Sequence, residues 1–67
     1  MNDKELLDRI TTHPKVMGGK PVIKGTRLTV ESILELLAKG STPDQIVNQY
    51  YGLSQDDVQA CKLYAKK

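Results

Sequence analysis

The most informative stretch of this chain is Gly18-Gly19-Lys20-Pro21-Val22-Ile23-Lys24-Gly25-Thr26-Arg27. Its glycines reach backbone angles that other residues avoid, and its proline has a fixed φ, so tight bends are expected at both ends. The β-branched pair at its centre, Val22 and Ile23, favours a short extended segment. The pattern predicts a bent β element with exposed cations. This element belongs to an N-terminal arm, residues 1–29, that precedes a helical body, residues 30–67.

The length of 67 residues allows a single domain, and 39% of the residues are hydrophobic, with no Phe or Trp. A core in so short a chain rarely contributes more than about 3–5 kcal/mol, so a further source of stability is expected. One cysteine excludes an internal disulfide, and one histidine with one cysteine cannot complete a zinc site. We therefore expect a homodimer, with its interface at Val22, Ile23 and Leu28.

The distribution of charge is more informative than the net charge of +2. Residues 9–30 contain five cations and no acid, whereas residues 31–57 contain five acids and one lysine. No apolar run approaches the roughly 18 residues needed to span a bilayer. The first five residues lack the basic start and apolar stretch of a signal peptide. The sequence therefore predicts a cytoplasmic protein with a basic arm and an acidic middle, without a membrane role.

The arm is expected to begin with a short helix over residues 2–9. Asn2 can cap this helix, and the glutamate three residues later suits a capping box. Ile10-Thr11-Thr12 favours a strand by composition. His13 precedes a proline and is pushed out of the α region, which predicts a turn.

The first helix of the body is expected over residues 30–39. Thr29 can serve as its N-cap, and Gly40 can end it in the left-handed conformation. Apolar side chains recur at the i, i+3, i+4, i+7 spacing of one buried face. These positions are Val30, Ile33, Leu34 and Leu37.

Two further helices are expected over residues 43–51 and 55–65. Thr42 begins a capping box with proline at the first helical position, and Ser54 can cap the last helix. A three-residue turn that begins at Gly52 joins the two helices, which is the outline of a helix-turn-helix. The side chains expected to face inward from these helices are Ile46, Val47, Tyr50, Tyr51, Val58, Cys61, Tyr64 and Ala65.

The sequence resembles domain-of-unknown-function family 433. The resemblance is carried first by the block from Gly18 to Val30, and then by the helical half of the chain, with Ile33 to Gly40, Thr42 to Ile46, Tyr50, Leu53-Ser54 and Asp57-Val58. It covers about residues 9–65. The family often has proline where this chain has Val30, but Thr29 supplies a cap at that helix start.

This resemblance implies a mainly α fold: a homeodomain-like three-helix bundle with a helix-turn-helix, preceded by a short N-terminal helix and a small β element. It also implies relatedness to VapB-type antitoxins of bacterial toxin–antitoxin pairs. The typical partner of such antitoxins is a PIN-like ribonuclease toxin. Members of the family are mostly uncharacterised, so the resemblance implies the fold more strongly than the function.

The residue types suggest double-stranded DNA as a partner. Lys20, Lys24 and Arg27 are the candidates for phosphate contacts, although they can equally protect an exposed β edge from aggregation. On the solvent side of the last helix, the candidates for base contacts are Gln55, Gln59 and Lys62. Asp56 and Asp57 oppose this interpretation, because a recognition helix meets bases with its N-terminal residues and these acids repel phosphates.

Two functions follow from these residues. The first is an antitoxin-like DNA-binding protein that neutralises a PIN-like ribonuclease and represses its own operon. The alternative is a dimeric protein-interaction module that binds no nucleic acid, which the acidic middle of the chain favours. We expect no enzyme, cofactor or metal site, because no paired carboxylates or nucleophile–base set can be assembled. His13 is expected in a turn, and Cys61 in the core.

Overall fold

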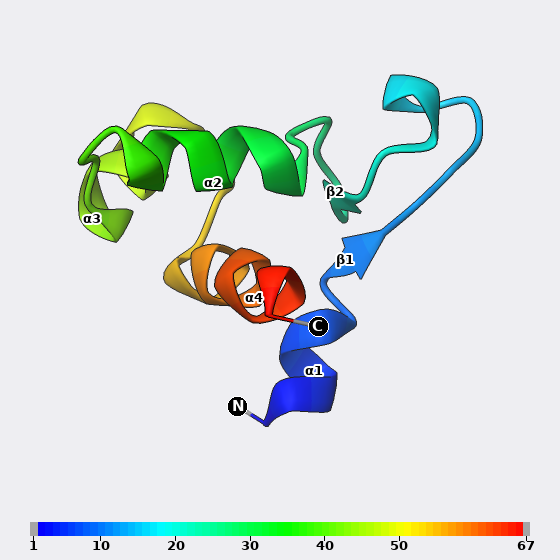
Figure 1. Cartoon of the computed structure of the whole chain (residues 1–67), viewed down its shortest axis with the longest axis horizontal. Coiled ribbons are helices and arrows are strands. Elements are labelled where there is room, and N and C mark those ends of the chain that lie inside the picture. Colours follow the sequence, from blue (N-terminus) through cyan, green and yellow to red (C-terminus); the bar gives the residue numbers. More distant parts are fainter. Residues whose placement is uncertain (1, 67) are drawn as a thin grey trace.

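The computed structural model describes residues 2–66, and it is mainly helical with a small two-stranded sheet. α4 crosses α2 on one side of the molecule, and α1 packs against α4 (Figure 1). No helix in this range is long and apolar enough to cross a membrane. The elements in chain order are α1 (Asp3–Leu7), β1 (Ile10–Thr11), the 3₁₀ helix η1 (Met17–Gly19), β2 (Val22–Ile23), α2 (Val30–Ala38), α3 (Pro43–Gln49) and α4 (Gln55–Ala65).

The predicted β element is confirmed as one strand of an antiparallel pair. Ile10 of β1 lies opposite Ile23 of β2, and Thr11 lies opposite Val22. After β2 the chain reverses through Gly25, whose φ of +80° lies in the left-handed region that favours glycine. This reversal lets β2 lead directly into α2.

Val22 and Ile23, which were expected at a dimer interface, are buried within the single chain. Their side chains are only 3% and 1% exposed in the single chain, because β1 covers β2 along one edge and the helical body packs against Ile23. A small core needs every large β-branched side chain, so these two residues stabilise the chain itself. Leu28, the third expected residue, is half-buried against the same core.

The predicted helix caps are confirmed. The side chains of Asn2, Thr29, Thr42 and Ser54 each accept a hydrogen bond from the amide three residues later. At the end of α2, the amide of Gly40 donates to Leu37 and the amide of Ser41 donates to Leu36. This pair of bonds is a Schellman motif, and it explains why the glycine at φ +101° ends α2.

The core lies where α2, α3 and α4 meet β2. Its buried members are Ile23, Val30, Ile33, Ile46, Leu53, Val58 and Cys61. Three predicted inward positions are wrong: Tyr51 is fully exposed, Tyr64 is 38% exposed and Ala65 is exposed. α3 ends at Gln49, which places Tyr51 in the turn.

Candidate nucleic-acid interface

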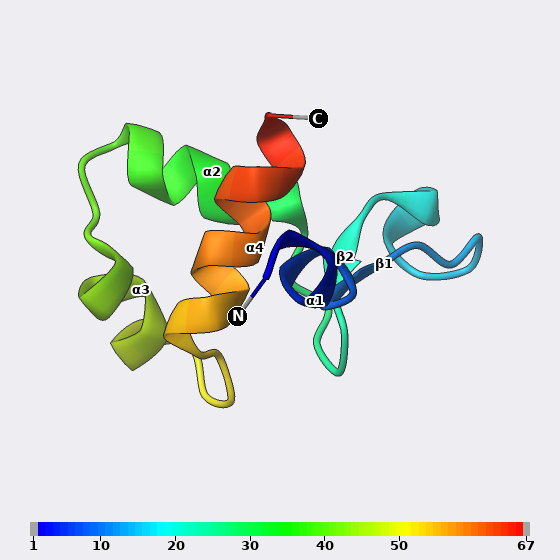
Figure 2. The same cartoon turned by 90° about the horizontal axis from the view of Figure 1, so that it is seen from below.

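α4 presents one polar face to solvent. A capping box between Ser54 and Asp57 begins the helix, and the core takes its opposite side through Val58 and Cys61. When the molecule is seen from below, α4 lies between α3 and α1 (Figure 2). The exposed residues of its outer face, which recur at helical spacing, are Gln55, Gln59, Lys62 and Lys66.

The acids at the start of α4 are held by a cation from the N-terminal segment. Arg9 Nη1 donates to Asp57 Oδ1 at 3.1 Å, and Arg9 Nη2 lies 3.6 Å from Asp56 Oδ2. Asp57 is only 7% exposed, and its other oxygen accepts bonds from the amide and hydroxyl of Ser54, both at 3.1 Å. One positive charge therefore offsets part of the negative charge that opposed phosphate binding here.

Sequence reasoning missed the role of Arg9. The pair that it forms with Asp57 joins residues 48 positions apart, so no local spacing indicates it. From the sequence, Asp57 can be recognised as the capping-box acid of α4, but this position does not indicate which cation pairs with it. The pair of Arg9 and Asp57 fastens the N-terminal segment to the start of α4.

The three side chains predicted to contact bases differ in their surroundings. The amide of Gln55 donates to Asp44 of α3, so this side chain already links the two helices of the helix-turn-helix. Within residues 2–66, neither Gln59 nor Lys62 has a hydrogen bond or ion pair with another side chain. These two side chains can therefore reach a ligand without breaking a bond.

The three cations predicted to contact phosphate are all exposed, but they do not form one cluster. Lys24 lines a shallow pocket at the start of α4 together with Arg9, and the same pocket is lined by three acids, Glu5, Asp8 and Asp57. The loop that carries Lys24 and Arg27 projects from the same side as the turn between α3 and α4 (Figure 2). Lys20 lies elsewhere, 3.8 Å from Glu31 at the start of α2.

Two other chemically active side chains have structural surroundings. Burial and, to a smaller extent, the charge of Asp57 raise the pKa of the Cys61 thiol to about 11, so it is protonated at neutral pH. His13 lies in an exposed turn, where Nδ1 accepts a bond from the amide of Lys15. Within residues 2–66, no group of three His, Cys, Asp or Glu residues is arranged to hold a metal ion.

The three helices of the body, with α1 and the two-stranded sheet, define a small, mainly helical bundle. The sequence profile of the family described as "Protein of unknown function (DUF433)" matches residues 10–65, and the chain belongs to this family.

A solved relative has the same fold. The crystal structure of a DUF433 member protein from Anabaena variabilis ATCC 29413 superposes with a TM-score of 0.84 at 27% sequence identity, covering 94% of this chain and 62% of the other. The uncharacterized protein y4eO of Sinorhizobium fredii (strain NBRC 101917 / NGR234) is 26% identical over 57 residues, which are 85% of this chain and 26% of that protein. The chain thus spans about a quarter of this curated relative.

Proposed function

We propose that the chain is a small helix-turn-helix protein that binds double-stranded DNA with the outer face of α4. The single observation that carries this proposal is the state of that face. Within the described residues, Gln59 and Lys62 are exposed and form no bond to another side chain, while Arg9 offsets part of the negative charge that would repel phosphate. Glutamine and lysine are suited to adenine, guanine and phosphate.

The loop after β2 supports the same proposal. Lys24 lines the pocket at the start of α4, and the loop from Lys24 to Arg27 projects from the same side as the turn between α3 and α4 (Figure 2). With α4 inserted into the major groove, this loop would lie on the side of the backbone phosphates. Lys20 is left out of this proposed interface, because it pairs with Glu31 at the start of α2. Three cations, Lys24, Arg27 and Lys62, therefore make the proposed phosphate contacts.

We further propose an antitoxin-like role, in which the chain neutralises a PIN-like ribonuclease and represses its own operon. The resemblance of the glycine-proline-cation block to the family signature supports this role. Co-expression with a PIN-like nuclease from a neighbouring gene tests it, with relief of growth arrest and a stable complex as the expected result. Undiminished toxicity beside a folded, expressed chain would contradict it.

Duplex binding is expected to depend strongly on salt. With three phosphate contacts, affinity should fall about 40-fold between 50 and 200 mM salt, because bound counterions are released. Fluorescence anisotropy with DNA from upstream of the gene measures this. The slope of log K against log salt concentration should become smaller in magnitude by about one in Lys62→Ala. Lys15→Ala, in an exposed loop away from α4, should leave this slope unchanged.

A protein-interaction module is the second candidate, and an apolar groove favours it. This groove lies between α2 and the last turn of α4 and is lined by Pro21, Val30, Leu34, Ala38 and Tyr64 among others. Absence of duplex binding even at 50 mM salt, together with a stable complex with the neighbouring nuclease, would select this candidate.

A further inference from the structure

Two grooves on either side of the last turn of α4 form one continuous apolar surface. The first, of about 570 Å³, runs along α2, and the second, of about 540 Å³, runs between α4 and α1. Leu34 and Ala65 line both grooves and therefore join them. We call this region the α2–α4 surface; its apolar residues are Leu6, Leu34, Ala38, Leu63, Tyr64 and Ala65.

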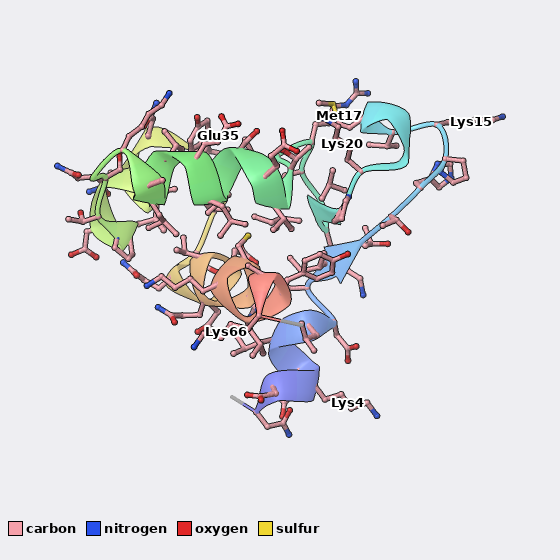
Figure 3. All side chains as sticks on the ribbon, in the orientation of Figure 1. Lys4, Lys15, Met17, Lys20, Glu35 and Lys66 are labelled. Carbon is pink, nitrogen blue, oxygen red and sulfur yellow. The ribbon has the colours of Figure 1, made fainter. Side chains whose placement is uncertain are left out.

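The two edges of the α2–α4 surface carry opposite charges. Glu31 and Glu35 of α2 form one edge, beside Lys20, and Lys62 and Lys66 of α4 form the other, beside Asp3 of α1. The first edge therefore has a net negative charge and the second a net positive charge. Figure 3 shows Glu35 on the side of α2 that points away from α4, and Lys66 on the far side of α4. Glu31 pairs with Lys20, but within residues 2–66 Glu35, Lys62 and Lys66 form no ion pair.

We propose that the α2–α4 surface binds a second copy of this chain. In such a dimer a two-fold axis lies in the interface and runs along the α2–α4 surface, between its two charged edges. Rotation about this axis brings each edge of one copy against the other edge of its partner. The acidic edge of one copy then faces the basic edge of its partner, twice over. A two-fold axis in the interface at right angles to this one would instead place Glu35 against Glu35, so the charges select one arrangement.

The size of a standard interface sets how much of the chain such a dimer would cover. A standard interface covers about 800 Å² of each partner, which is about a sixth of the 4561 Å² accessible surface described for this chain. The contact would cover Tyr64, one of the few large apolar side chains that the fold leaves exposed. It also replaces the interface that was expected at β2, where the side chains are buried.

The proposal does not depend on DNA binding, but it has a consequence for it. Lys62 belongs both to the basic edge of the α2–α4 surface and to the proposed duplex contacts. Two ligands that need the same side chain oppose each other's binding by linkage. DNA should therefore favour the monomer, and raising the protein concentration should weaken duplex binding per chain.

Charge exchange tests the dimer directly. Sedimentation equilibrium of the full chain should give a Kd in the micromolar range. Glu35→Lys and Lys62→Glu should each weaken self-association at least tenfold, because each places like charges across the interface twice. The double variant should restore it, since both edges are then reversed and complementary again. Within one chain these two side chains form no ion pair, so a purely structural role predicts no such recovery.

Lys15→Glu is the matched control, because it makes the same charge change in a loop outside both grooves. Circular dichroism should show that all variants fold, since every altered side chain is exposed. A native chain that stays monomeric up to about 1 mM would overturn the proposal, since a dimer with a micromolar Kd is almost fully associated at that concentration. Self-association that is unchanged in the single variants, or not recovered in the double variant, would also overturn it.

Discussion

Replacing Ile33 with alanine is expected to leave most of the protein unfolded at 25 °C. The side chain is 0% exposed, and it lies at the centre of α2 in the cluster that α2, α3 and α4 share with β2. Removing three buried carbons from such a site costs about 2–5 kcal/mol, because a cavity remains where the apolar contacts were. A core of this size contributes only about 3–5 kcal/mol, so the loss is comparable with the total.

Urea denaturation followed by far-ultraviolet circular dichroism measures this effect. The matched control is Met17→Ala, since Met17 is 49% exposed in η1 and should change the free energy of unfolding by less than about 0.5 kcal/mol. An Ile33→Ala variant with a native-like urea midpoint would mean that the described core does not hold the helices together.

Asp57→Ala is expected to destabilise the protein by about 2–3 kcal/mol, by two separate mechanisms. The variant loses the capping box at the start of α4, and it removes the main partner of Arg9. The carboxylate is largely buried, whereas the arginine side chain is 33% exposed and can regain water. The expected loss is therefore smaller than for a fully buried pair.

Two variants separate the mechanisms at Asp57. Asp57→Asn keeps an oxygen for the Ser54 amide and removes the charge, so it should cost about half as much as Asp57→Ala. Asp56→Ala should cost less than about 1 kcal/mol, because the side chain is 50% exposed and lies 3.6 Å from Arg9. Equal losses for Asp56→Ala and Asp57→Ala would contradict the described arrangement.

The helix starts and the end of α2 could be predicted because local chemistry determines them. The side chains of Thr29, Thr42 and Ser54 each accept a hydrogen bond from the amide three residues later. Gly40 adopts the left-handed conformation, which residues with a side chain usually avoid. Such signals need no knowledge of what the rest of the chain does. The strand at Val22 was predictable for the same reason.

The burial of individual side chains was less predictable, because it depends on which elements pack together. Val22 and Ile23 were expected at a dimer contact, but β1 and the helical body cover them. Tyr51 continues the apolar face of α3 by spacing alone, yet α3 ends before it. Ala60 is fully buried although it lies on a face that was not expected inside, since α1 packs against α4.

The candidate interface was predictable in part. The exposed positions of α4 follow from helical periodicity, so Gln55, Gln59 and Lys62 were correctly expected at the surface. The position of Arg9 against Asp57 was not predictable, because a contact between residues 48 apart depends on the complete fold. The separation of Lys20 from Lys24 likewise depends on how the chain bends between them.

Amide chemical-shift mapping of the full chain with a short DNA duplex at low salt tests the proposed function most directly. The account predicts shifts at the outer face of α4, centred on Gln59 and Lys62, and in the loop from Lys24 to Arg27, all lost as salt is raised. No shifts at low salt, or shifts confined to the part of the α2–α4 surface contributed by α2, would contradict the account.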